Sequence, residues 1–577
     1  MSGGVPAGAG RLDRVIDRRS ALAALEDEAF DLVVVGGGIT GAGVALDAAS
    51  RGYSVALVER SDYASGTSSR SSKLVHGGLR YLQNFDLGLV REALLERQLM
   101  VALAPHLVRP LPLLVPAFEG ARPDRLTGMG LNLYDVMAVE RRTLKGTGRR
   151  GLRARLPREA RIPTDASWSP DRHRIVSGQE VARLLPALAA REPSAGYLFY
   201  DCQTDDSRLV LTVLGEAERF GAVCVNRLEV TGLHEEAGRA AGVHVSDLLD
   251  GGRFTVRADN VVNATGVWAD RLRPHELHDE AEVPRIRPSR GTHVTVHHDD
   301  LPLVGGAIVP AGGGRTIFAL PWLGRTLLGT TDKDYEGELD HVRADDDDVE
   351  YLLEAVNAFF ATELGPGDLT GAYAGVRPLI TTGDPRKSVD ISRKAELYET
   401  SSGMVTITGG KLTTWRRMAK MAVDRLVERE ARDAPCRTHV IPLGAPVDAA
   451  TLPRVEGLPE PAYAALAARY GHSARDVLVV AGEREELARP IVADLPDPLA
   501  EVVHAARHEQ ANHPGDVLLR RTRLGLLAAR DVEAGGPTAR RVVQAMGREL
   551  DWDDARRAVE LEGWRFEAAA EGILADP

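Results

Sequence analysis

A short stretch with a histidine, an arginine and a tyrosine around two glycines carries side chains suited to chemistry. It reads HGGLRY over residues 76–81. His76 can take up a proton near neutral pH, because the ordinary pKa of histidine is ~6.5. The glycines leave room for a flat ring to approach, and Arg80 and Tyr81 can bind an anion. The stretch therefore indicates a site that holds an anionic substrate and moves a proton.

Two more cations stand in similarly constrained settings. Arg377 lies in YAGVRPL and Lys411 in TGGKLTTWR. Arginine suits phosphate, because its planar guanidinium makes two parallel charge-assisted hydrogen bonds. We expect Arg377 and Arg80 to bind a phosphate.

A run of hydroxyl side chains, TSSRSS, covers residues 67–72. Serine and threonine hydroxyls there can donate hydrogen bonds to phosphates or to the edge of a ring. Taken alone, an ordinary polar loop explains this run at least as well.

A glycine-rich turn predicts a dinucleotide site. Gly36-x-Gly38-x-x-Gly41 follows a predicted buried strand at 32–35 and opens a predicted helix that runs to residue 51. Glu59 ends the next predicted strand, where an acidic side chain binds ribose hydroxyls. Gly36 permits the tight turn, Gly38 lets the backbone approach a pyrophosphate, and Gly41 lets the helix pack closely on its strand. The helix N-terminus attracts the anion. A glycine turn in an ordinary βαβ unit is the alternative.

The elements that must position these residues follow a mixed pattern. Helix and strand signals alternate irregularly to about residue 430, as in α/β proteins. Short strands separated by turns at 283–332 predict an antiparallel sheet. Residues 447–577 are patterned as helices and predict a separate helical domain. Residues 1–30 predict a loose tail followed by a short amphipathic helix at 20–29.

Composition narrows the function classes. The 577 residues carry a formal net charge of −12, which argues against general binding to nucleic acid. Cys202, Cys224 and Cys436 have no metal-ligand or CxxC spacing, so we expect neither a metal site nor a disulfide framework. We expect no secretory signal and no transmembrane helix. These features fit a reducing cytosol.

Taken together, the motifs resemble the FAD-dependent, respiratory glycerol-3-phosphate dehydrogenases of bacteria. The matching stretches occur in the family's order over about residues 31–430, and together they are highly specific. They are GGGITGAG (36–43), TSSRSSKLVHGGLRYL (67–82), YDCQTDDSRLVL (200–211), NATGVWA (263–269), RGTHVTV (290–296), LGTTD (328–332), AGVRPL (374–379) and GGKLTTWR (409–416).

The resemblance implies FAD as the cofactor and an α/β fold. That fold has a Rossmann-like, doubly wound FAD-binding domain, an antiparallel-sheet substrate domain and a C-terminal helical domain. The implied boundaries are 1–30 for the N-terminal tail, 31–105, 196–282 and 376–435 for the FAD-binding domain, 106–195 and 283–375 for the substrate domain, and 436–577 for the helical domain.

The resemblance also implies roles for individual residues. Arg80, Tyr81, Arg377 and Lys411 would surround the substrate and the flavin. His76 and His293 match the two candidate proton acceptors. His293, which follows a predicted strand, is favoured slightly over His76 as the base, and a purely structural role remains open for each histidine. Lys411 would stabilise negative charge on the reduced ring. The implied cofactor-binding residues are Gly36, Gly38, Ile39, Thr40, Gly41, Glu59, Arg60, Thr67, Ser68, Ser69, Ser72, Lys73, Ala264, Thr265, Gly266, Gly410, Lys411, Leu412 and Thr413.

The implied reaction is oxidation of glycerol 3-phosphate to dihydroxyacetone phosphate, with a quinone as the electron acceptor. Because quinones lie in the bilayer, we expect a cytoplasmic protein that rests peripherally on the inner face of the membrane. The candidate contact surfaces are residues 107–118, which could instead be buried, and the basic run 141–155. A homodimer is possible. The alternatives are an oxidase that uses oxygen, an amine or amino-acid oxidase, and a flavin-binding protein without turnover.

Overall fold

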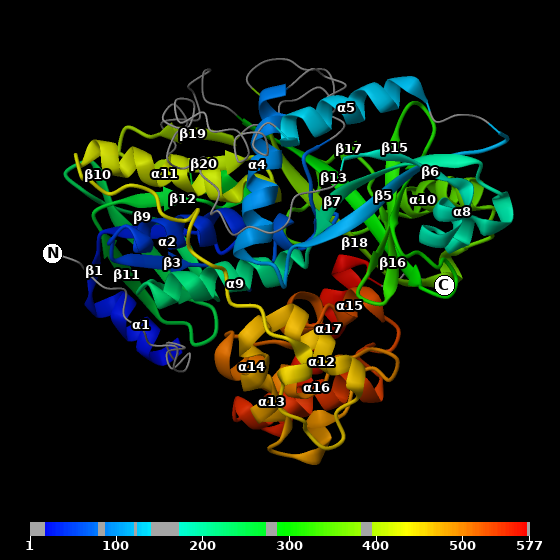
Figure 1. Ribbon diagram of the computed structural model, residues 1–577. Helices are drawn as coiled ribbons and strands as arrows, with labels where there is room; N and C mark the ends of the chain where they lie inside the picture. The colour runs from blue at the N-terminus through cyan, green and yellow to red at the C-terminus, as the bar shows by residue number, and fades with distance from the viewer. Residues whose placement is uncertain are drawn as a thin grey trace.

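The computed structural model describes residues 18–78, 87–120, 124–139, 172–272, 285–381 and 395–573. Within them the chain forms two sheet-based regions side by side and a helical region packed below both (Figure 1). This arrangement confirms the predicted α/β fold class with a C-terminal helical domain. The domain boundaries themselves stay predictions.

The glycine turn belongs to a mostly parallel sheet. Its strands lie in the order β19-β20-β12-β2-β3-β8, and all neighbours pair in parallel except β19 with β20. The strands are β19 (Ala395–Glu399), β20 (Val405–Gly409), β12 (Val261–Asn263), β2 (Leu32–Val35), β3 (Val55–Val58) and β8 (Val223–Val225). The four residues of β2 and of β3 are all buried, as continuous apolar runs in parallel sheets predict.

Each face of this sheet has its own cover. Leu32, Val34 and Leu57 face a core formed with α2 (Ile39–Ser50), α9 (Asp206–Arg219) and α11 (Trp415–Arg429). Val33 and Val58 face a second sheet and α1 (Arg18–Asp27). The second sheet has the order β1-β11-β10-β9, with β1 (Ala29–Phe30), β11 (Arg253–Ala258), β10 (Arg239–Asp247) and β9 (Leu228–Glu236).

The substrate region is a large, mainly antiparallel sheet in the order β17-β13-β16-β15-β14-β5-β7-β4, with β18 paired to β13 and β6 paired to β7. Its strands are β4 (Leu74–Val75), β5 (Arg109–Ala117), β6 (Arg174–Ser177), β7 (Ala195–Gln203), β13 (Arg285–His297), β14 (Gly306–Pro310), β15 (Thr316–Trp322), β16 (Arg325–Gly329), β17 (Lys333–Asp334) and β18 (Leu369–Thr381). The helices beside it are α4 (Leu87–Leu103), α5 (Arg125–Val139), α8 (Gly178–Leu184) and α10 (Asp346–Phe360). The antiparallel sheet predicted at 283–332 therefore exists, and it is wider than that range.

The C-terminal region is helical, as the sequence predicted (Figure 1). It contains α12 (Glu460–Tyr470), α13 (Ala474–Ala481), α14 (Ala500–His508), a π-helical turn (Asp516–Arg521), α15 (Leu524–Leu527), α16 (Pro537–Glu549) and α17 (Asp554–Glu571). Its core is continuous with apolar side chains of the large sheet, among them Leu320 and Leu327. The helical region is therefore packed on the substrate sheet.

One predicted surface is wrong. Residues 107–118 do not offer an apolar patch for a membrane, because Leu111, Leu113 and Leu114 are buried where β5 pairs with β7. A sheet strand and an exposed apolar loop have the same composition, so the sequence could not separate them. The basic run 141–155 lies outside the described residues.

Candidate active site

The glycine turn has the geometry that its sequence predicts. Gly36 adopts φ +111°, and a Cβ there would lie 2.8 Å from the Ala264 carbonyl oxygen. At Gly41 an added Cβ would lie 1.9 Å from the Gly36 carbonyl oxygen, so only glycine allows the first turn of α2 to pack on its strand. The Ile39 amide donates to the Ser68 hydroxyl at 2.9 Å, which joins the turn to the hydroxyl-rich loop.

Glu59 is fixed beside this turn. Its carboxylate accepts hydrogen bonds from the Gly37 and Ser61 amides, both at 2.7 Å. Burial raises the pKa of this carboxyl, and the two amide hydrogen bonds partly offset that effect. The side chain is therefore held where an acceptor for ribose hydroxyls is needed.

An elongated cavity of about 570 Å³ runs from this turn toward the helical region. It is lined by most of the residues predicted to bind the cofactor, which come from five separate stretches of sequence. These are Gly36, Gly38, Ile39, Thr40, Glu59, Arg60, Thr67, Ser68, Ala264, Thr265, Gly266, Gly410, Lys411 and Leu412. The Thr408 hydroxyl donates to the Gly266 carbonyl at 3.1 Å, which ties two of these stretches together.

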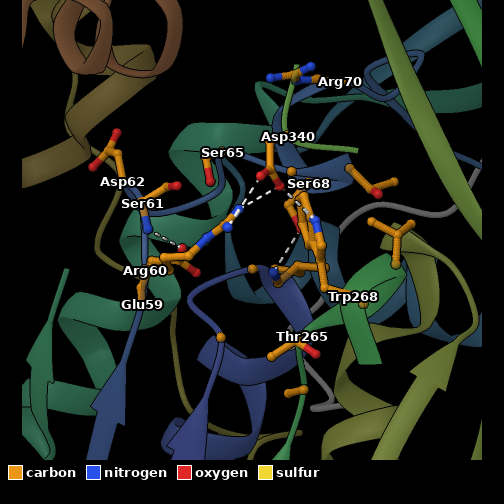
Figure 2. A pocket seen from close by; sticks show the side chains of 18 of the residues that line it. Glu59, Arg60, Ser61, Asp62, Ser65, Ser68, Arg70, Thr265, Trp268 and Asp340 are labelled. Atoms are coloured by element: carbon orange, nitrogen blue, oxygen red, sulfur yellow. Dashed lines mark hydrogen bonds and ion pairs between the residues drawn. The ribbon is translucent and has the colours of Figure 1, made fainter. Parts of the chain in front are cut away.

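An ion pair crosses one wall of the cavity (Figure 2). Arg60 donates to Asp340 at 2.6 Å, and the Trp268 indole donates to the same carboxylate at 2.9 Å. The neighbouring Arg60 and Arg271 guanidiniums lower the pKa of the partly exposed Asp340, although burial acts in the opposite direction. Arg60 is therefore held on the cavity wall, and Asp340 brings a loop of the substrate region against the FAD-binding sheet.

His293 is buried in the substrate sheet beside the hydroxyl-rich loop. Its side chain is 2 % exposed, its Nε2 lies 2.9 Å from the Ser72 hydroxyl, and its ring stacks on Tyr373 at 4.8 Å. Burial, with the positive charges of Lys73 and Arg377, lowers the pKa of His293 well below its ordinary value. The imidazole is therefore neutral near pH 7 and able to accept a proton.

Two glycines clear space for the reactive side chains on this sheet. A Cβ at Gly329, which pairs with His293 across β13 and β16, would lie 2.3 Å from the ring carbon Cδ2. A Cβ at Gly291 would lie 2.4 Å from Nη2 of Arg377. Arg377 therefore lies over Gly291, two residues along β13 from His293 and on the same face. Its guanidinium also contacts Asp332 at 3.4 Å and the Thr330 hydroxyl at 3.2 Å.

The other predicted histidine lies at the junction of two loops. The His76 amide donates to the Thr413 hydroxyl at 3.2 Å, and that hydroxyl lies 3.3 Å from the His76 carbonyl oxygen. Thr413 follows Lys411 and Leu412, which line the cavity. The structure therefore brings His76 next to the predicted Lys411 loop, and the Thr67 hydroxyl donates to the Val376 carbonyl beside Arg377 at 2.5 Å.

Several predicted residues lie apart from the cavity surface. Gly41, Ser69, Ser72, Lys73 and Thr413 are outside the lining of this cavity, and so are the predicted substrate residues His76, His293 and Arg377. The Lys73 ammonium is fully buried and donates to Asp206 at 2.8 Å. Arg80 and Tyr81 fall outside the described residues. The predicted roles of all these residues stay predictions.

Sequence reasoning missed three charged residues around the site. Asp340 contacts Arg60, Asp206 binds Lys73, and Arg523 of the helical region binds Asp206 at 2.9 Å. Asp206 stands in the stretch YDCQTDDSRLVL and Arg523 in the basic cluster RRTR. These patterns show that the residues are charged, but Asp206 and Arg523 are 317 positions apart in the sequence. The sequence alone therefore could not predict that they pair.

Comparisons with known proteins agree with this geometry. Residues 31–425 match the family described as FAD dependent oxidoreductase, and residues 405–557 match the C-terminal domain of alpha-glycerophosphate oxidase. The chain is 37% identical to glycerol-3-phosphate dehydrogenase 2 of Mycobacterium tuberculosis, over 95% of this chain and 89% of the relative. The chain belongs to the FAD-dependent glycerol-3-phosphate dehydrogenase family.

Two further matches also cover most of this chain. It is 34% identical to the aerobic glycerol-3-phosphate dehydrogenase of Bacillus subtilis, over 88% of this chain and 89% of the relative. The crystal structure of the glycerol-3-phosphate dehydrogenase from Bacillus halodurans complexed with FAD has a TM-score of 0.74 and 27% identity, and the match covers 97% of this chain and 98% of that one. The fold is therefore shared along almost the whole chain.

The residues of this dehydrogenase fit FAD. Gly36 and Gly41 keep side chains out of the turn at the start of α2, and Glu59 presents a buried carboxylate at the end of β3. Hydroxyls and backbone groups from distant stretches line one continuous cavity. FAD is the cofactor of this family.

The described residues also bear on metal binding and on membrane spanning. No group of three or more His, Cys, Asp or Glu side chains there could hold a metal ion. No helix there is both long and apolar enough to span a bilayer. Cys202, Cys224 and Cys436 are buried and free.

Proposed function

We propose that this protein oxidises sn-glycerol 3-phosphate to dihydroxyacetone phosphate. The observation that carries the proposal is His293. It is a buried, neutral imidazole, anchored by Ser72 and stacked on Tyr373, on the same sheet face as Arg377. A base and an anion-binding guanidinium are what removal of hydrogen from a phosphorylated alcohol requires. The names of the family's curated relatives support the same substrate.

His293 takes the proton of the substrate hydroxyl in this proposal. The lowered pKa keeps the ring unprotonated, which is the state that can accept a proton, although the same shift makes it a weaker base. The Ser72 hydroxyl holds Nε2, and the stacked Tyr373 ring restricts rotation of the imidazole. His76 stays the alternative base.

Arg377 binds the substrate phosphate in this proposal. Its contact with Asp332 is long, at 3.4 Å, and its side chain is 22% exposed. Part of the guanidinium therefore faces solvent, from which a phosphate can approach. Lys411 adds a second positive charge from the cavity wall.

The residues that line the cavity would hold FAD, and a bound flavin would supply the hydride acceptor for this reaction. The chain's part is to exclude water and to hold the alcohol still. His293 and Tyr373 are both buried, and Gly291 and Gly329 bring the strands close to the reactive side chains.

Anaerobic mixing with glycerol 3-phosphate tests the proposal. The flavin absorbance of the purified protein should be lost, and dihydroxyacetone phosphate should form in equal amount. His293→Asn should slow this bleaching much more than His76→Asn does. A flavin that stays oxidised in the unaltered protein would contradict the assigned substrate, and the opposite order of the two variants would assign the base to His76.

We also propose that a quinone accepts the electrons. The curated relatives are named dehydrogenases, whereas the matching C-terminal domain is described from an oxidase, so oxygen is the second candidate. Parallel turnover assays with a soluble quinone analogue and with dissolved oxygen distinguish them. Turnover with the quinone alone supports the dehydrogenase, and rapid peroxide formation supports the oxidase.

A quinone acceptor requires contact with the bilayer, so we propose a cytoplasmic protein that rests on the inner membrane face. Met129 of α5 and Ile175 of β6 expose 68% and 62% of their surface and support an apolar contact. Flotation with liposomes should bring the protein to the lipid fraction, and Met129→Gln should reduce it. Leu248→Gln is a control on an exposed apolar residue in the turn that follows β10 of the second sheet. A homodimer stays a prediction.

A further inference from the structure

A cluster of buried arginines of the helical region contacts the FAD-binding region. Arg520, Arg521 and Arg523 are each at most 4% exposed and lie in and just after the π-helical turn (Asp516–Arg521). Arg521 donates to both carboxylate oxygens of Asp62, at 2.8 and 2.9 Å, and Arg520 donates to the same carboxylate at 2.6 Å. Asp62 follows Glu59 in the loop that lines the cavity.

Arg523 reaches the hydroxyl-rich loop itself. Its Nη2 donates to the Ser69 carbonyl at 2.7 Å and to Asp206 at 2.9 Å. Asp206 also accepts from the Ser71 amide at 3.0 Å and from the Lys73 ammonium at 2.8 Å. The loop 69–73 is therefore wrapped around one fully buried carboxylate, whose Oδ1 accepts from two cations, Lys73 and Arg523.

This loop carries the hydrogen-bond partner of His293. Ser72, which bonds Nε2 of His293 at 2.9 Å, stands between Ser71 and Lys73. The Tyr373 hydroxyl donates to the Ser71 carbonyl at 2.8 Å, while its ring lies under the Lys73 ammonium at 4.7 Å and stacks on His293. A shift of the loop therefore moves both groups that orient the imidazole.

The residues after Arg523 also form hydrogen bonds with β13, the strand of His293, and with its neighbour β16. The Leu526 carbonyl accepts from the Thr295 hydroxyl at 2.6 Å, two residues from His293, and the Leu527 carbonyl accepts from Arg325 at 2.9 Å. A Cβ at Gly371 would lie 2.3 Å from the Leu526 carbonyl oxygen, so the segment is seated directly on β18. The segment 523–527 is thus hydrogen-bonded both to loop 69–73 and to the substrate sheet.

We infer that Arg523 of the C-terminal helical region is a positioning residue for proton transfer, which holds loop 69–73 so that Ser72 orients His293. The inference rests on the proposed function of His293. It gives the helical region a part in the chemistry through the loop that it holds. Without the guanidinium, Asp206 keeps Lys73 as its buried cationic partner, and the Ser69 carbonyl keeps only its hydrogen bond from the Lys73 ammonium, at 2.5 Å.

The test compares Arg523→Gln with Arg469→Gln in the full-length holoenzyme. Arg469 is an apt control, because it is also buried in the helical region but pairs with Asp497 and Glu501 there. Arg523→Gln should lower kcat for glycerol 3-phosphate by about ten- to a hundredfold, the effect of one charge-assisted hydrogen bond. KM and flavin content should change little, and Arg523→Lys should recover part of the loss. Arg469→Gln should change kcat little.

Hydrogen exchange gives a readout that does not depend on turnover. The Ser71 amide bonds Asp206, and the Lys73 amide bonds the Ser71 hydroxyl at 3.1 Å, so exchange in the peptide 66–78 reports the loop. It should accelerate in Arg523→Gln and not in Arg469→Gln. Unchanged exchange and kcat in Arg523→Gln, or equal kcat losses in both variants, would overturn the inference. If Arg523→Gln does not fold, Arg523→Lys is measured in its place against the same control.

The two proposals fail in different ways. Absence of flavin bleaching in the unaltered protein would refute the substrate, whatever the variants do. Normal bleaching in the unaltered protein with full kcat in Arg523→Gln would refute only the positioning role.

Discussion

Gly329 faces His293 so closely that one methyl group there should disturb the base. A Cβ at this position would lie 2.3 Å from Cδ2 of the ring. An ordinary contact needs at least 3.4 Å, so the ring or the strand must give way by roughly 1 Å. Misplacement by ~1 Å costs on the order of 10²-fold in rate, or about 2.7 kcal/mol of activation free energy. Gly329→Ala should therefore lower kcat about a hundredfold.

The assay is stopped-flow reduction of the flavin by saturating glycerol 3-phosphate, with flavin content and thermal stability measured alongside. Gly232→Ala is the matched control, because Gly232 also lies in a strand, β9, and a Cβ there would meet nothing within 4 Å. The control should reduce its flavin at the unaltered rate. A Gly329→Ala protein that keeps its flavin and reduces it within about threefold of the unaltered rate would refute the reasoning, because it would show that the position of His293 does not limit the reaction.

Three further predictions follow from the site. The neutral form of His293 is the active one, and the pKa of His293 is lowered. The measured kcat/KM should therefore stay level as the pH falls to ~6.5, the ordinary pKa of histidine, and should decline only well below that pH. A decline centred near pH 7 would point to another group, such as Lys73, whose pKa is lowered by burial to about 7. Arg377→Ala should weaken use of glycerol 3-phosphate by about ten- to a hundredfold and use of glycerol far less, whereas equal losses in steady-state assays would make Arg377 structural. Gly36→Ala should lose bound flavin, measured as absorbance per chain, because its Cβ would lie 2.8 Å from a backbone oxygen; Gly52→Ala, which shares the positive φ but has nothing within 4 Å, should keep it.

The fold was predictable where a local pattern has one structural solution. The buried strand at 32–35, the glycine turn and the following helix are present as expected, because a bare apolar run before GxGxxG fits a covered parallel strand. The strand pairing was not predictable. β12 lies between β2 and β20, and these strands come from residues far apart in the chain.

The site was predictable in its residue types and less so in its contacts. Placement of His293 opposite Gly329 needs the register of β13 with β16, which the sequence does not contain. Lys73 illustrates the limit most clearly. Its motif placed it beside the cofactor, but its ammonium is turned to Asp206 and is buried. Only the position of Asp206 at the start of α9 explains that orientation.

The order of strands in the FAD-binding sheet has a consequence for synthesis of the protein. The strand β2 emerges from the ribosome early. Its neighbour in the sheet, β12, begins at Val261, and β20, which pairs with the far edge of β12, begins at Val405. At about 5–20 residues per second, the growing chain waits on the order of tens of seconds for these partners. During that interval an unpaired, wholly apolar strand edge is available to any other chain nearby. Correct biogenesis of this flavoprotein therefore requires that the open edge of the emerging β2 be shielded until β12 has been translated.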